Sequence, residues 1–68
     1  MKYKIICVLV VSGIERMRGT VILEENSTDV FGEIYNEVQN SSASRFPSGT
    51  KQIGDKAYFN WQLIRALQ

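Results

Sequence analysis

Histidine is absent from this sequence, and cysteine occurs only once, as Cys7. Histidine is the side chain that most often serves as a general acid or base at neutral pH, so its absence argues against acid–base catalysis. A single cysteine cannot form an intrachain disulfide, and it cannot hold zinc without further ligands. Its neighbours Ile6 and Val8 indicate a buried, unreactive thiol, which is typical of a protein in a reducing compartment such as the cytoplasm.

The sequence also lacks the other patterns that mark reactive or metal-binding sites. It has no glycine-rich phosphate loop, and Glu24, Glu25 and Asp29 do not have the spacing of a calcium-binding EF-hand. The serine hydroxyls have no histidine to activate them, and they fit helix caps and loops better. We therefore expect a protein that is not an enzyme and that has no cofactor and no metal site.

Long apolar segments are missing as well. The longest run, residues 5–11, has seven residues, whereas a membrane-spanning helix needs about 20, so no membrane contact is expected. Lys2 and Lys4 give this run some likeness to a secretion signal, but no small-residue cleavage site follows it. We expect residues 1–68 to form a single domain. Because a domain of this size buries only about 60% of its unfolded surface, oligomerisation or partner binding would supplement its core.

What the sequence does contain is a pattern of strands around one helix. Residues 3–11 are rich in β-branched side chains and are apolar at both alternating sets of positions, which is typical of a central strand. Residues 18–25 place Val21 and Leu23 on one face. The two segments are expected to pair as an antiparallel hairpin whose loop is residues 13–17.

The predicted helix follows residues 26–28, which are three successive N-cap candidates. Apolar residues then recur at helical spacing and fall on one side of the helix. These residues are Val30, Phe31, Ile34, Tyr35 and Val38. The polar run 40–44 ends the pattern.

Two further strands are predicted in the C-terminal part. Residues 50–53 and 56–63 flank residues 54–55, a Gly-Asp pair that suits a two-residue hairpin loop. The large apolar residues of the last strand share one face: Phe59, Trp61 and Leu63. Over residues 61–68 the apolar spacing fits either a strand or a helix.

Together these elements predict an α+β fold. One amphipathic helix would lie on one face of an antiparallel sheet of three to four strands, in the order β-β-α-β or β-β-α-β-β. A single helix covers a single face. The apolar residues on the second face of the first strand, Ile6, Val8 and Val10, therefore either pack among their neighbours or form an interface with a partner or a second copy.

Charge is separated along the sequence. Residues 19–44 contain five acids and no Lys or Arg, whereas all eight basic residues lie outside this segment. The five acids are Glu24, Glu25, Asp29, Glu33 and Glu37. The last three form one row at one-turn spacing on the predicted helix, although like charges so placed destabilise a helix by roughly 0.2–0.5 kcal/mol per pair. Such a row is either a solvated surface or a contact for the basic surface of another protein.

The basic residues support a second interpretation. Arg16 and Arg18 lie near the predicted hairpin loop, and Tyr3, Tyr58 and Trp61 lie on predicted strands. Basic and aromatic side chains on a sheet can bind the phosphates and bases of single-stranded nucleic acid. However, the sequence pI of about 7.9 is low for a nucleic-acid-binding domain. The basic residues would alternatively meet the acidic helix of a second copy in a twofold homodimer.

In size, in its lack of histidine and in its lack of an active site, the chain resembles the small accessory proteins of phages and mobile elements. Many of those occlude the surface of a host protein, and the resemblance implies this kind of function without assigning residue roles. We predict a non-catalytic protein-binding inhibitor that occludes a basic surface of its partner. The predicted contacts are the acids Asp29, Glu33, Glu37, Glu24 and Glu25, with Arg16 and Arg18 as a secondary basic contact. The alternative is a small nucleic-acid-binding protein that uses the basic, aromatic-bearing sheet and the hairpin loop.

Overall fold

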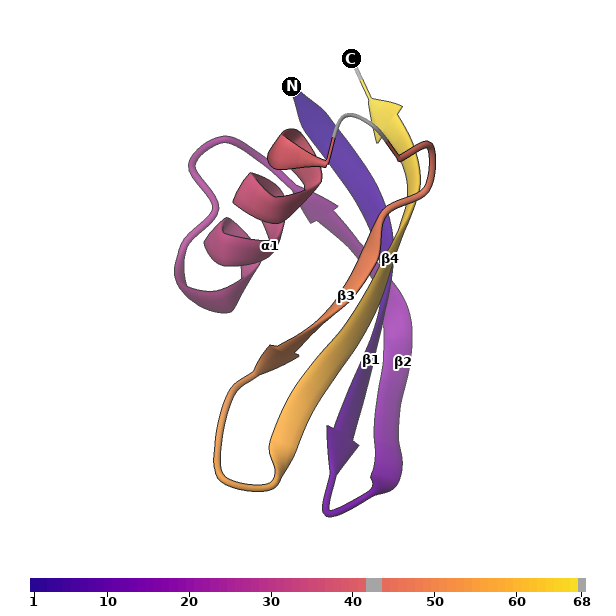
Figure 1. Ribbon diagram of the computed structural model, residues 1–68, viewed down its shortest axis with the longest axis vertical. Coiled ribbons are helices and arrows are strands. Elements are labelled where there is room, and N and C mark those ends of the chain that lie inside the picture. The colour runs from indigo at the N-terminus through magenta and orange to yellow at the C-terminus, as the bar shows by residue number, and fades with distance from the viewer. Residues whose placement is uncertain (42–43, 68) are drawn as a thin grey trace.

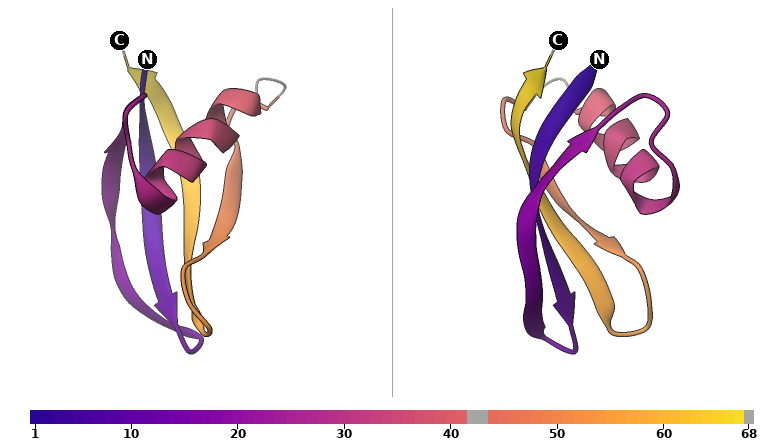
Figure 2. Two further views of the ribbon diagram at one scale, coloured as in Figure 1. Left: turned by 90° about the vertical axis from the view of Figure 1, so that its left-hand side faces the viewer. Right: turned by 180° about the vertical axis from the view of Figure 1, so that it is seen from behind.

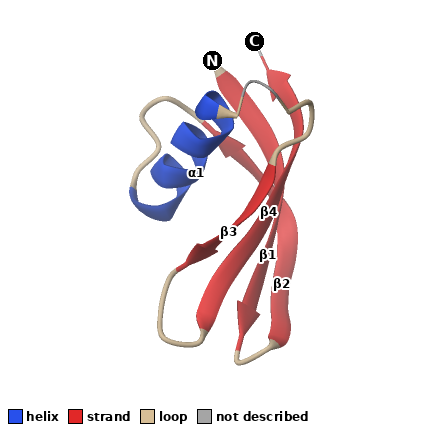
Figure 3. Ribbon diagram, viewed as in Figure 1, coloured by secondary structure: helices blue, strands red, loops and turns tan. Residues whose placement is uncertain are grey.

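The computed structural model of the protein describes residues 1–41 and 44–67. It confirms the predicted α+β fold with four strands, which form one antiparallel sheet in the order β2-β1-β4-β3. The helix and strands follow one another in β-β-α-β-β order (Figures 1 and 3). The elements are β1 (Lys2–Val11), β2 (Ile14–Leu23), α1 (Asp29–Asn40), β3 (Ser48–Gln52) and β4 (Ala57–Leu67).

The two longest neighbours, β1 and β4, form the centre of the sheet and pair along almost their whole length, from Lys2 opposite Leu67 to Val11 opposite Ala57. The sheet is longer than the helix, and α1 crosses only the half that holds the two termini (Figure 2). The tight ends of both hairpins project beyond it. The fold therefore has a two-layer half and a single-layer half.

The core lies between α1 and one face of the sheet. Ile34, Tyr35 and Val38 are the buried residues of the helix, as the helical spacing predicts. They pack against a cluster that includes Ile5 and Leu23, both completely buried. Complete burial of an aliphatic side chain of this size contributes about 1.5–3 kcal/mol, so these contacts hold the helix on the sheet.

The predicted alternation along β1 is confirmed from Tyr3 to Val8, whereas Val10, which the alternation places with Ile6 and Val8, is buried. Tyr3, Ile5 and Cys7 point toward the helix and are buried, whereas Ile6 and Val8 lie on the opposite face and are half-buried. On β4, Trp61 lies opposite Cys7 and shares the helix-covered face. The Cys7 thiol is buried as expected, and this burial raises its pKa.

The predicted loop of the first hairpin, residues 13–17, is wrong. Strand β2 begins already at Ile14, and the turn consists of Ser12 and Gly13, whose φ angles are 52° and 78°. Positive φ at two successive residues is what a tight type I′ turn requires, and it matches the twist of the flanking strands. A register shift between Leu9 and Val10 absorbs the extra residue of β2 as a β-bulge.

The second hairpin also differs from its prediction, because β3 ends at Gln52 and four residues, not two, separate it from β4. The backbone N–H groups of Ile53 and Gly54 both donate to the carbonyl oxygen of Ala57, at 2.9 and 3.2 Å. Beyond Trp61 the chain continues as a strand to Leu67, since β1 pairs with it there. The final residue of the 61–68 prediction lies outside the described residues.

Candidate functional site

The face of the sheet opposite α1 has no second layer over it in the part of the chain that the structure describes (Figure 2). Ile6 and Val8 of the central strand β1 lie on this face and are half-buried. Ile22 of β2, which is opposite Lys4 in the register, is 45% exposed. We call this surface the uncovered face, and it has an apolar centre on its middle strand.

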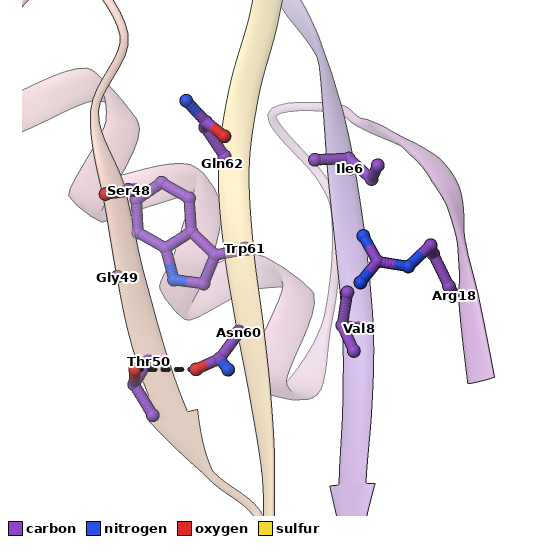
Figure 4. Close-up of a pocket in the computed structure, with 9 residues that line it drawn as sticks. All are labelled: Ile6, Val8, Arg18, Ser48, Gly49, Thr50, Asn60, Trp61 and Gln62. Atoms are coloured by element: carbon purple, nitrogen blue, oxygen red, sulfur yellow. Dashed lines mark hydrogen bonds between the residues drawn. The ribbon is translucent and has the colours of Figure 1, made fainter. Parts of the chain in front are cut away.

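A hollow of about 330 Å³ marks the middle of the uncovered face. Val8 and Arg18 lie on one side of it, and polar side chains from β3 and β4 lie on the other (Figure 4). The Thr50 hydroxyl donates to Asn60 Oδ1 at 2.9 Å, which ties the edge strand β3 to the central strand β4 on the polar side of the hollow. The residues that line the hollow include Ile6, Val8 and Arg18 on one side and Thr50, Asn60 and Gln62 on the other.

Trp61 closes the floor of this hollow from the helix-covered side. Its indole lies over Gly49 of β3, where a Cβ atom would come within 2.8 Å of the ring. Trp61 is buried, yet its Nε1–H has no hydrogen-bond partner among the residues that the structure describes. It also borders a smaller hollow of about 220 Å³ near Glu37, whose Oε2 is buried and likewise has no hydrogen-bond partner within residues 1–41 and 44–67. Sequence reasoning did not find this pair of polar atoms, because it depends on contacts between distant elements.

The charges of the uncovered face are mainly positive. Lys4 lies directly opposite Arg65 in the β1–β4 register, and neither forms an ion pair with a residue that the structure describes. Like charges directly opposite one another destabilise a sheet. Arg18 differs, because the Glu15 carboxylate accepts two hydrogen bonds from it at 2.8 and 3.3 Å, and this contact raises the pKa of Arg18.

The fold brings several of the predicted acidic contacts to basic groups of the same chain. Glu24 lies 3.3 Å from Lys2 Nζ, and Glu25 lies 3.2 Å from the N-terminal amine. Glu37 pairs with Lys51 of β3 at 3.2 Å. The separation of charge along the sequence is therefore partly neutralised in three dimensions.

The rest of the acidic row is more open. Asp29 and Glu33 are exposed, and within residues 1–41 and 44–67 neither has an ion pair. The structure thus leaves two members of the predicted row available on the helix, while Glu37 is already engaged. Arg16 of the secondary basic contact is exposed at the β-bulge, and Arg18 points to the uncovered face.

The aromatic residues predicted for nucleic-acid binding are not brought together. Tyr3 and Trp61 belong to the core under α1, and the Tyr3 ring packs against Tyr35 with centroids 5.4 Å apart. Tyr58 lies on the uncovered face, opposite Val10, and is half-buried. One aromatic ring on this face does not form a platform for successive bases.

No protein-family model, no curated protein and no solved structure matches this chain. Among the described residues there is no cluster of three side chains that could hold a metal ion. The described helix α1 is too short to cross a membrane.

Proposed function

We propose that this protein is a non-catalytic protein-binding module whose contact surface is the uncovered face of its sheet. The observation that carries the proposal is an apolar centre, Ile6 and Val8, on the central strand β1 of a sheet face over which the described residues form no second layer. Protein interfaces commonly combine such an apolar centre with a polar rim, and the centre supplies most of the binding free energy. Here Asn60 and Gln62 form the polar rim beside it.

The charge of this face indicates an acidic partner surface. Lys4 and Arg65 lie opposite each other and form no ion pair with an acid in the described part of the chain, so a partner carboxylate would relieve their mutual repulsion. Binding of a protein over this face would occlude that partner's own acidic surface. A protein partner fits better than a single nucleic-acid strand, because aliphatic side chains occupy the centre where stacking aromatic rings would be needed.

A second contact, from the helix, would suit a basic partner surface. The exposed carboxylates of Asp29 and Glu33 support it, since both lack an ion pair within the described chain. This is the part of the predicted acidic row that the fold leaves unengaged. Substitution of Glu33 by Lys tests it separately, because this position is on the opposite layer from the uncovered face.

The proposal is tested with a Val8→Glu variant, which places an acid at the apolar centre of the uncovered face. The matched control is Asn36→Glu, which adds the same charge at an exposed helix position. Each variant would be used as bait in lysate of the cells that produce the protein, after thermal melting has shown that it is folded. We expect the wild type and Asn36→Glu to capture the same partner protein from the lysate, and Val8→Glu to fail to capture it.

The result that would overturn the proposal is equal capture of every partner by Val8→Glu and the wild type. Loss of binding by Glu33→Lys alone would move the contact to the helix. Capture that disappears after nuclease treatment would favour nucleic-acid binding, which titration with a fluorescent oligonucleotide at low salt would then confirm.

A further inference from the structure

We infer that the outer edge of β2 pairs with β2 of a second copy around a twofold axis at Gly19, which forms one continuous eight-stranded sheet. Strand β2 has ten residues, and no described strand pairs with its outer side. The left-hand view of Figure 2 shows it at the margin of the sheet. An unpaired edge presents a row of backbone donors and acceptors and is a template for another strand.

Natural edge strands carry features that prevent pairing with other chains, and the two edge strands of this sheet differ in these features. The opposite edge, β3, is only five residues long and follows the buried Pro47. On β2, the β-bulge and the charges of Glu15 and Arg16 protect only the end near the turn. Residues 19–23 have the sequence Gly-Thr-Val-Ile-Leu, without a charge or a proline. An uncharged, β-branched edge of this kind favours pairing.

The side chains of β2 also indicate that this edge is covered by a second copy of the chain. Three large apolar residues on this one strand are exposed, Ile14 at 55%, Met17 at 67% and Ile22 at 45%. An apolar hollow of about 270 Å³ lies beside the strand on the helix side, where Phe31 and Met17 line it. Gly19 has no side chain, and a Cβ atom there would meet nothing within 4 Å, so the face beside this position is open for the side chain of a residue opposite it.

Strand length and charge together select the register, since an axis at Arg18 or at Gly19, on either side of the midpoint of β2, pairs most of the strand. A twofold axis at Met17 would place Arg16 of each copy opposite Arg18 of the other, and an axis at Arg18 would place that residue opposite itself. Like charges directly opposite one another are unfavourable in an antiparallel pair. With the axis at Gly19, Arg18 is opposite Thr20, and Met17 is opposite Val21. The apolar pair then encloses the hollows of both copies.

This arrangement keeps the helices of both copies on one side of the sheet, because the twofold axis is perpendicular to it. The uncovered faces then lie side by side on the other side. The dimer would double the surface offered to a partner without covering it. The inference does not depend on the proposed function, since it concerns the edge of the sheet and not its face.

The first test is the mass in solution together with cysteine trapping. Light scattering is expected to give about twice the chain mass of 7.7 kDa, falling toward one chain mass on dilution. Under oxidation by glutathione disulfide, Gly19→Cys should form a disulfide-linked dimer. Thr50→Cys, on the edge strand β3, should not. An equal mixture of Met17→Cys and Val21→Cys chains should crosslink more than either variant alone.

The second test uses the sign of a charge. In this register Thr20 faces Arg18 of the other copy, so Thr20→Glu should tighten the dimer and Thr20→Lys should weaken it. Two symmetric cross-strand pairs change, which corresponds to roughly a 2- to 30-fold shift in the dimer dissociation constant in each direction. Thermal melting of the dilute variants checks that the monomer fold is intact.

A wild-type protein that stays monomeric at about 1 mM overturns the inference. A dimer whose Gly19→Cys and mixed variants fail to crosslink also overturns it, because the copies then meet elsewhere. Equal effects of Thr20→Glu and Thr20→Lys would reject the register centred on Gly19. Partner binding that survives in a monomeric Thr20→Lys variant leaves the proposed function intact, so the two proposals fail independently.

Discussion

The Glu37 carboxylate of α1 lies 3.2 Å from Lys51 Nζ of β3 and joins the helix to the far edge of the sheet. Glu37 is the last member of the acidic row that the sequence places on the helix. Because the Lys51 side chain is only 25% exposed, this pair is better shielded from solvent than the ion pairs of Glu24 and Glu25. One residue of the row therefore has a structural role within the chain.

This difference within the row predicts opposite effects of two similar substitutions. Glu37→Gln should lower the free energy of unfolding by about 0.2–1 kcal/mol, since it breaks the pair with Lys51. Glu33→Gln should leave it unchanged or raise it by roughly 0.2–0.5 kcal/mol, because it removes repulsion from Asp29 and Glu37. Urea unfolding at low salt measures both. At high salt the two variants should converge, and a persistent difference would point to packing instead of charge.

Gly32 gives a second prediction, which runs against helix propensity. Alanine is normally favoured over glycine inside a helix by up to about 1 kcal/mol. At this position, however, a Cβ atom would lie 2.6 Å from the carbonyl oxygen of Ser27, which belongs to the backbone before the helix. We expect Gly32→Ala to lower the free energy of unfolding by about 1–3 kcal/mol, as overpacking does.

Chemical denaturation of Gly32→Ala beside Asn36→Ala checks this prediction. Asn36 is exposed on the same helix, so its substitution by alanine should be neutral or stabilising. A Gly32→Ala protein that is more stable than the wild type would show that the loop before α1 moves away at little cost.

Buried Cys7 predicts how stability depends on pH. Burial raises the pKa of its thiol above the ordinary value of 9.0 in the folded state. Between the two pKa values the unfolded chain binds fewer protons than the folded one, so the free energy of unfolding falls as the pH rises. The loss should begin near pH 9, and Cys7→Ala should remove it. Burial and the nearby Tyr35 hydroxyl also raise the pKa of Tyr3, which extends the decline above pH 10 in both proteins. Identical profiles for the wild type and Cys7→Ala up to pH 10 would contradict the assignment to Cys7.

The sequence predicts the fold well where a pattern repeats. The two-sided apolar alternation around Cys7 predicts the central strand, and the spacing of Ile34, Tyr35 and Val38 predicts the buried side of the helix. The sequence-based prediction fails at the turn after Val11. The structure has a tight turn there, with positive φ at Ser12 and Gly13, whereas the residue pattern fits a longer loop as well. Hydrophobic periodicity also does not reveal the β-bulges, since each one depends on the partner strand.

The candidate site is less predictable, because charges are paired by tertiary contacts. Lys2 and Glu24 are far apart in sequence and opposite in sign, and only the fold shows that they lie within 3.3 Å. The uncovered face, in contrast, follows from counting layers: Ile6 and Val8 are apolar, and one helix cannot cover both faces. The sequence thus indicates that one face of the sheet has no helix over it, and the structure shows which residues lie on that face.

The last prediction concerns Lys4 and Arg65, which are directly opposite each other on the uncovered face. An opposite-charge pair at such a position is favourable and a like-charge pair unfavourable, each by roughly 0.2–1 kcal/mol. Arg65→Glu should therefore raise the free energy of unfolding by an amount in this range, although it alters an exposed residue of the proposed contact surface. Lys56→Glu, an equal charge change in the exposed loop between β3 and β4, should give no such gain.

The same Arg65→Glu variant should lose affinity for an acidic partner, so stability and binding would move in opposite directions. That opposition is what a functional surface produces, because residues kept for a partner repel one another in the free protein. Urea unfolding and partner capture of the two variants measure both effects. If Arg65→Glu is no more stable than Lys56→Glu, solvent screens the repulsion between Lys4 and Arg65. The like-charge pair then no longer supports a partner-binding role for this face.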